Sequence, residues 1–130
     1  MREIEFRGLR LDGKEWIYGY YFLTQTGEAV MFQSDYRSLD GIFPVQVTRV
    51  QKDTIGQLAG LTDKFGVRIF EGDIISFEDD PFALVTWNEF LCCWTYHEVN
   101  AIDPEPMRKD ESKYYIIHGN IHQNPELLAQ

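Results

Sequence analysis

Apolar and polar residues alternate along most of the chain, which is the period-two pattern of β-strands with one buried face. The clearest case begins at Trp16, because Trp16, Tyr18, Tyr20 and Phe22 fall on one face of an extended segment. On this pattern we predict nine strands, at residues 3–7, 16–22, 29–32, 43–50, 67–70, 74–77, 82–87, 91–99 and 114–118.

Short polar segments rich in Gly, Asp and Pro separate these strands and predict turns. Asp12-Gly13 is a typical hairpin pair, and the stretch from Asp63 to Gly66 begins with a turn-forming Asp and ends with Gly. Further turns are expected at 24–28 and 78–81, and exposed loops at 34–41 and 100–113.

Two segments carry a possible helical signal. Residues 54–61 place Ile55 and Leu58 at helical spacing, but the glycines at 56 and 60 disfavour a helix, so this segment stays open. At the C-terminal end, Asn124 suits an N-cap and Pro125 suits the first helical position, which predicts a short C-terminal helix.

The composition supports a β-rich fold of ordinary domain size. Of 130 residues, 44% are hydrophobic and 15% are aromatic, and aromatic side chains favour pleated sheets. The length fits a single domain over residues 1–130. There is no internal repeat, and a weak subdivision falls near residues 52–66, between an N-terminal sheet and a C-terminal β unit.

The charge narrows the range of partners. With 21 acidic and 12 basic residues the chain has a formal net charge of −9, whereas a protein that follows a phosphate backbone needs clustered Lys and Arg. We therefore expect no direct binding of nucleic acid and no association with an anionic membrane. A protein partner or self-association remains compatible with this charge.

The cysteines and histidines do not form a recognisable metal or disulfide pattern. Cys92 and Cys93 are adjacent, so a bond between them would close a strained ring, and they do not form a C-x-x-C pair. His118 and His122 are separated by Gly119-Asn120, which favours a turn instead of a helix presenting both rings. We expect no bound metal, no disulfide and a cytoplasmic protein, because the N-terminus lacks the apolar core of a signal peptide.

Candidate catalytic groups are few. Glu71 and Asp73 would share a strand face and could act as an acid–base pair, with His118 as a third member of a small hydrolase site. The competing interpretation is a bend, in which Gly72 supplies the backbone freedom and Asp73 accepts backbone hydrogen bonds, and we favour it. Either cysteine could be a nucleophile, but no activating motif is nearby, and in a strand the two sulfurs would face opposite sides. No glycine-rich phosphate loop or other cofactor motif is present, so we expect no cofactor.

The aromatic stripe of residues 16–22 has two interpretations. Exposed, it would be a binding face or a base-stacking platform; at strand period it is more often part of a core. Because the residues between include Gly19 and Tyr21, the other face is also partly apolar, which is compatible with a partly buried, self-associating sheet.

Several motifs in a fixed order extend over the chain, and together they make the sequence resemble the YopX family. They are Met1-Arg2-Glu3-Ile4-Glu5-Phe6-Arg7, Gly60-Leu61-Thr62-Asp63-Lys64-x-Gly66, Arg68-Ile69-Phe70-Glu71-Gly72-Asp73-Ile74-Ile75, Val85-x-Trp87-Asn88 and His118-Gly119-Asn120-Ile121-x-x-Asn124-Pro125-Glu126-Leu127-Leu128. Residues 8 to about 52 contain no such motif. The resemblance implies a small β-rich protein of phages and prophages in bacteria, and it brings no catalytic or ligand-binding residues with it.

The motif residues that we single out are expected to be structural. They are Gly60, Asp63, Gly66, Glu71, Gly72, Asp73, Trp87, Gly119, Asn120, Asn124 and Pro125.

The expected fold class is mainly β, with antiparallel strands, a small SH3-like, partly open barrel in the C-terminal half and a short C-terminal helix. The SH3-like element rests on an analogy with strand–turn–strand order alone. The leading functional hypothesis is a non-catalytic phage or prophage accessory protein that binds another protein. The alternatives are an acidic mimic of nucleic acid that inhibits a host DNA-binding protein, with carboxylates from 78–80 and 103–111, and a small hydrolase.

Overall fold

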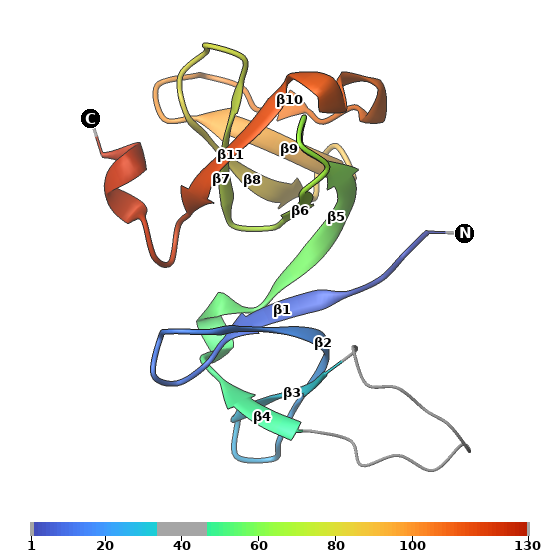
Figure 1. Cartoon of the computed structure of the whole chain (residues 1–130), viewed down its shortest axis with the longest axis vertical. Coiled ribbons are helices and arrows are strands. Elements are labelled where there is room, and N and C mark those ends of the chain that lie inside the picture. Colours follow the sequence, from blue (N-terminus) through green and yellow to red (C-terminus); the bar gives the residue numbers. More distant parts are fainter. Residues whose placement is uncertain (1, 34–46, 130) are drawn as a thin grey trace. The chain divides into compact units, whose positions relative to one another are not determined.

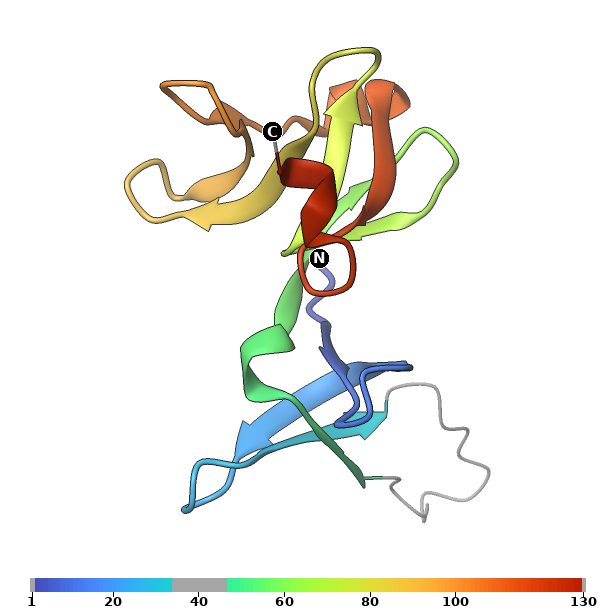
Figure 2. The ribbon, with the colours of Figure 1, turned by 90° about the vertical axis from the view of Figure 1, so that its left-hand side faces the viewer.

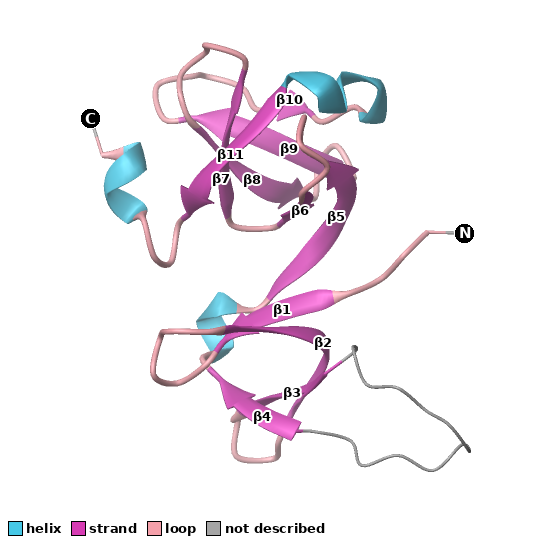
Figure 3. Cartoon of the chain, in the orientation of Figure 1, coloured by secondary structure: helices cyan, strands magenta, loops and turns pink. Residues whose placement is uncertain are grey.

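The computed structural model describes residues 2–33 and 47–129, and antiparallel strands dominate it (Figures 1 and 3). The chain divides into two compact units, Glu3–Gln57 and Leu58–Gln130, each with its own hydrophobic core. The prediction of a mainly β, antiparallel fold is therefore confirmed.

The N-terminal unit contains four strands in the order β4-β3-β2-β1. They are β1 (Phe6–Leu9), β2 (Trp16–Leu23), β3 (Ala29–Gln33) and β4 (Val47–Val50). A bridge between Arg10 and Val50, and a 2.8 Å hydrogen bond from Gln51 N–H to the Leu9 carbonyl, join the end of β1 to the end of β4. The four strands therefore curl around a common interior. The short helix η1 (Lys52–Thr54) follows, and the hydroxyl of Thr54 accepts a 2.9 Å bond from Leu9 N–H.

The interior of this unit is small, and this reverses one expectation about the aromatic stripe. Its hydrophobic core cluster consists of Ile17, Ala29, Met31 and Val50. At Gly8, even a Cβ would come within 2.9 Å of Val50 Cγ2. Since Ile17 points inward, the alternate residues Tyr18, Tyr20 and Phe22 point outward and are exposed, Tyr20 to 53%. The interpretation of the stripe as core is wrong for these three residues, whereas Trp16 is half-buried. On the opposite face Ile17 is buried, but Tyr21 and Leu23 are exposed as well.

The C-terminal unit contains the remaining strands, and Figure 2 shows them from a second direction. They are β5 (Gly56–Thr62), which begins in the N-terminal unit, β6 (Arg68–Phe70), β7 (Asp73–Phe77), β8 (Ala83–Asn88), β9 (Cys93–Glu98), β10 (Glu105–Pro106) and β11 (Tyr115–Asn120). Five of them form a sheet in the order β10-β9-β8-β7-β11, while β5 pairs with β6. The core consists of Ala59, Leu61, Ile69, Ile75, Val85 and Tyr115.

The structure decides or corrects several local expectations. The open segment 54–61 is mostly strand, in β5. The stretch 100–113, expected to be a plain loop, contains β10 and most of the helix η2 (Lys109–Tyr114). The predicted loop 34–41 and the first part of the predicted strand 43–50 lie outside the described residues.

The C-terminal helix is not confirmed as expected. The last element is a short 3-10 helix, η3 (Pro125–Leu128), with Asn124 at the N-cap position and Pro125 in the first turn, as expected, but the Asn124 side chain makes no capping hydrogen bond. The Asn124 side chain instead accepts a hydrogen bond from the backbone of Asn120. The SH3-like barrel is likewise not confirmed; the observed arrangement is the five-stranded sheet described above. Within residues 2–33 and 47–129, no helix has the length and apolar content needed to cross a membrane.

Candidate functional site

The motif residues of the 60–66 and 71–73 stretches lie in turns of the C-terminal unit. A single oxygen of Asp63, Oδ1, accepts 2.9 Å hydrogen bonds from the N–H groups of Phe65 and Val67, and this holds the β5–β6 turn. Asp73 is 3% exposed, and its Oδ2 accepts a 2.8 Å bond from Phe70 N–H. The carboxylates of both aspartates are therefore engaged with backbone amides.

Gly72 makes backbone hydrogen bonds to two other parts of the C-terminal unit, strand β8 and the segment that follows β11. Its φ is +92°, its N–H donates to the Val85 carbonyl and its own carbonyl accepts from Ile121 N–H, at 2.9 and 2.8 Å. The left-handed φ favours glycine, because a side chain there is strained. Glu71 precedes it in the same turn and is half-buried.

Hydrogen bonds between side chains and backbone join the residues of the motif at the end of β11. Asn120 Oδ1 accepts from the N–H groups of His122 and Gln123, at 3.1 and 2.9 Å. The N–H of Asn120 in turn donates to Asn124 Oδ1 at 3.2 Å, directly against Gly119. The remaining singled-out residues are Gly60 in β5, Gly66 in the β5–β6 turn, Trp87 in β8, with its ring 5.3 Å from that of Trp94, and Pro125 at the start of η3.

The alternative catalytic hypotheses involve His118 and the two cysteines, and the structure shows what surrounds His118 and where Cys92 lies. His118 Nε2 lies 2.8 Å from the hydroxyl of Ser76, which is 1% exposed and donates to the Glu78 carbonyl. Cys92 lies in the turn before β9, not in the strand, so the expectation of two strand cysteines on opposite faces is wrong. Among the described residues, no three His, Cys, Asp or Glu side chains are placed to hold a metal ion.

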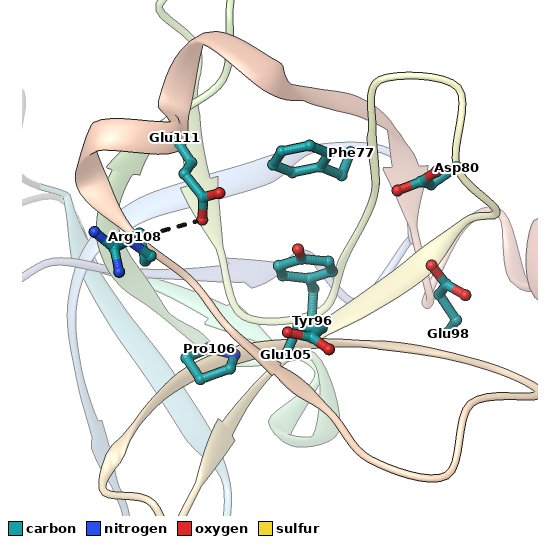
Figure 4. Close-up of a pocket in the computed structure, with 8 residues that line it drawn as sticks. All are labelled: Phe77, Asp80, Tyr96, Glu98, Glu105, Pro106, Arg108 and Glu111. Atoms are coloured by element: carbon teal, nitrogen blue, oxygen red, sulfur yellow. Dashed lines mark ion pairs between the residues drawn. The ribbon is translucent and has the colours of Figure 1, made fainter.

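One pocket of the C-terminal unit combines charge, aromatic surface and volume. It measures about 610 Å³, and Figure 4 shows the ring of Tyr96 at its centre. Its lining residues are Phe77, Asp80, Tyr96, Glu98, Glu105, Pro106, Arg108 and Glu111.

Four different elements bring these side chains together. Phe77 ends β7, and the turn that follows is closed by a 3.0 Å bond from Asp80 N–H to the Phe77 carbonyl. Glu105 on β10 pairs with Tyr96 on β9, which places the carboxylate beside the ring. Glu111 comes from η2. One member of the acidic cluster 78–80, Asp80, and two members of the cluster 103–111, Glu105 and Glu111, thus line one pocket.

The pocket changes the acidity of its central phenol. Burial raises the pKa of Tyr96 from 10.0 to about 12, with further contributions from Tyr115, Glu111, Glu105 and Asp80. A tyrosine is a neutral phenol at physiological pH even at its ordinary pKa, and the Tyr96 hydroxyl can both donate and accept hydrogen bonds.

Arg108 is the basic side chain of the pocket wall, and a neighbouring carboxylate already holds it. Its Nε and Nη2 donate to the two oxygens of Asp110 at 3.1 and 2.9 Å, and Glu111 lies 4.0 Å away. The hydrogen bond to Asp110 raises the pKa of Arg108, and the hydrogen bond from Arg108 lowers that of Asp110. The pocket itself carries four carboxylates and one guanidinium.

The charge of the whole chain is concentrated around this unit. Residues 58–130 contain 13 acidic and 5 basic residues, a net of −8, whereas residues 1–57 contain 8 and 7, a net of −1. An acidic pocket with aromatic walls can attract and hold an organic cation.

The sequence indicates part of this site but not its centre. Asp80, Glu105 and Glu111 belong to acidic clusters that are visible in the sequence, whereas Phe77, Tyr96 and Glu98 show only the pattern of strand residues. Their position on one face depends on the pairing of β7, β8 and β9, which no local pattern specifies.

Apolar residues are also exposed away from the pocket. Tyr18, Tyr20 and Phe22 form the outer aromatic face of β2, with the Phe22 ring stacked 5.2 Å from Phe32. In the C-terminal unit, Phe90 is 98% exposed at the tip of the β8–β9 hairpin. Both are surfaces that a protein partner could cover.

The chain has clear similarities to known proteins. The model of the family described as YopX protein matches residues 5–129. Among solved structures, the crystal structure of protein EF1440 from Enterococcus faecalis is similar, with a TM-score of 0.65 and 20% sequence identity over 98% of this chain and 99% of that one. At this identity the likeness shows the fold alone. No curated protein matches the sequence.

Proposed function

The chain belongs to the YopX family, and on that premise we propose that it is a non-catalytic accessory protein of phages and prophages that binds another protein in the cytoplasm of the bacterial host. The observation that carries the proposal is the pocket of the C-terminal unit. Four carboxylates surround the rings of Phe77 and Tyr96, and aromatic anchors with charged rims are typical of protein interfaces.

The residues that could have formed a catalytic site make structural hydrogen bonds instead, and this supports a binding role. The Asp73 carboxylate accepts a hydrogen bond from the Phe70 backbone, and His118 hydrogen-bonds to a buried serine. The pocket, in contrast, presents acids spread around an aromatic centre, which suits recognition of positive charge.

The test uses affinity capture from the bacterial host followed by measurement with the purified partner. Glu98→Gln combined with Glu105→Gln removes two pocket carboxylates with little change in shape, and we expect it to weaken the binding at least tenfold. The matched control is Glu89→Gln with Glu126→Gln, because both residues are exposed, belong to the same unit and carry the same charge outside the pocket. Equal loss of binding in both pairs would contradict a role for the pocket.

Self-association is the competing use of the exposed aromatic residues. Light scattering of the purified chain, compared with a Tyr20→Ser, Phe22→Ser variant, separates the two possibilities. If the parent forms a stable oligomer and this variant is monomeric, the outer face of β2 forms contacts between copies of the chain and not with a foreign partner.

A second candidate function, an acidic mimic of nucleic acid, is favoured by the net charge of −8 in residues 58–130. In that case the partner is a DNA-binding protein, and duplex DNA competes with the chain for it. Binding that duplex DNA leaves unchanged would exclude the mimic and leave the protein-binding role intact.

A further inference from the structure

The pocket of the C-terminal unit is shaped for a cation larger than a metal ion. Its volume is about 610 Å³, and in Figure 4 Asp80 and Glu98 lie on one side of the Tyr96 ring while Arg108 and Glu111 lie on the other. Within the described residues these carboxylates do not converge as a set of metal ligands. Carboxylates spread around the pocket in this way suit an organic cation whose positive charge is spread over several atoms.

Guanidinium and ammonium groups make different demands on such a site. A guanidinium is planar, presents donors in several fixed directions and stacks on aromatic rings, whereas an ammonium is a compact and strongly hydrated point charge. Phe77 and Tyr96 supply the aromatic surface, Glu105 on β10 pairs with Tyr96, and Glu98 on β9 lies on the same side of the Tyr96 ring as Asp80 (Figure 4). The lining therefore complements a guanidinium better than an ammonium.

Arg108 shows how this unit holds a guanidinium. It donates two hydrogen bonds to the two oxygens of Asp110, and it approaches Glu111 at the edge of the pocket. No other basic side chain among the described residues lines the pocket. Asp80, Glu98 and Glu105 leave an excess of negative charge in the pocket for an incoming cation.

We propose that this pocket binds the guanidinium of an arginine side chain presented by the protein partner, against the rings of Phe77 and Tyr96 and between the carboxylates of Glu98 and Glu105. The inference rests on the proposed protein-binding function and names the group that the pocket recognises. Arg108 then limits the affinity, because its positive charge repels the arriving guanidinium.

The test uses three small probes and NMR of the full chain. N-acetyl-arginine methylamide, its lysine counterpart and its citrulline counterpart differ only at the end of the side chain. We expect the arginine probe to shift the amide signals of Tyr96, Glu98 and Glu105 in a saturable manner. The lysine probe should bind several-fold more weakly, and the uncharged citrulline probe should leave these signals unchanged.

Variants connect the shifts to the pocket. Glu98→Gln with Glu105→Gln should reduce the affinity for the arginine probe at least tenfold, whereas the control Glu89→Gln with Glu126→Gln should reduce it less than twofold. Arg108→Gln should raise the affinity several-fold. Equal affinity for the arginine and lysine probes, or an equal effect of the two glutamine pairs, would overturn the inference.

The same variants separate this inference from the proposed function. If the arginine probe does not bind but the Glu98, Glu105 pair still loses the protein partner, the guanidinium assignment is wrong and the protein-binding pocket stands. If the partner binds the Glu98, Glu105 pair as tightly as the parent, the pocket is not where the partner binds, and the guanidinium assignment fails while a protein-binding role elsewhere on the chain stands. Only the absence of any captured partner contradicts the proposed function itself.

Discussion

The side-chain oxygen of Asn124 occupies the space in which a side chain on Gly119 would stand. A Cβ on Gly119 would lie 2.5 Å from Asn124 Oδ1 and 2.9 Å from Asn124 Cγ, closer than real Cβ contacts. The same oxygen accepts the 3.2 Å hydrogen bond from Asn120 N–H. Glycine at 119 and asparagine at 124 therefore depend on each other.

Gly119→Ala should destabilise the chain by about 1–3 kcal/mol, because it displaces Asn124 and leaves the Asn120 N–H without its acceptor. Asn124→Gly alone should cost about 1 kcal/mol for the lost hydrogen bond. The check is a double-mutant cycle by urea unfolding.

In that cycle, the double variant Gly119→Ala, Asn124→Gly should be more stable than the sum of the two single losses predicts, since the obstructing side chain is gone. Strict additivity of the two losses would show that the close approach of Gly119 and Asn124 carries no energy.

Gly72→Ala should destabilise the chain by about 1 kcal/mol or more, because φ at this position is +92°. The nearest side-chain atom to an added Cβ is His122 Nε2, at 3.4 Å. Adding His122→Ala to Gly72→Ala should therefore restore little stability. Equal melting temperatures for the parent and the Gly72→Ala variant would contradict the prediction.

Tyr96 should ionise at about pH 12, since burial and nearby carboxylates raise its pKa from 10.0. An absorbance titration of the parent, minus that of Tyr96→Phe, isolates this phenol. Replacing Glu105 and Glu111 by Gln should lower the pKa, since both charges oppose formation of the phenolate.

The raised pKa also links Tyr96 to stability at alkaline pH. The unfolded chain releases this proton near pH 10, while the folded chain keeps it to about pH 12. The contribution to stability is therefore fully present below pH 10 and is lost as the pH rises through the folded pKa. Tyr96→Phe should show a shallower loss of stability with rising pH in this window; an unchanged slope would argue against the linkage.

The purified chain should not bind duplex DNA directly. Residues 58–130 carry a net charge of −8, and the adjacent basic pair Arg108-Lys109 has Asp110 and Glu111 beside it. Arg108 is also hydrogen-bonded to Asp110, so the field of the pair is largely cancelled within a Debye length of about 8 Å. A gel-shift assay at low and high salt is the measurement, and salt-sensitive retention of DNA would refute the prediction.

Local sequence predicted most of the β elements, because period-two alternation and turn residues act over a few positions. The turns at Asp12-Gly13 and at 62–66 occur where expected, and the strand at 16–22 corresponds to β2. The start of the C-terminal element also follows from local preference, since Asn124 is at the N-cap position and Pro125 is in the first turn. Its extent does not: the element is only the 3-10 helix Pro125–Leu128, and the Asn124 side-chain oxygen bonds to the backbone of Asn120.

The sequence by itself determined that the chain is acidic, rich in aromatics and built of antiparallel strands, since these follow from composition and short-range pattern. Only the tertiary structure decided which face of β2 is buried. Both faces are partly apolar, and in the folded unit Ile17 packs with Met31 in the core while Tyr18, Tyr20 and Phe22 are exposed. The pocket also depends on the tertiary structure. Along the chain, 16 residues separate Asp80 from Tyr96 and 9 separate Tyr96 from Glu105. Strand pairing between β7, β8, β9 and β10 is what brings them together.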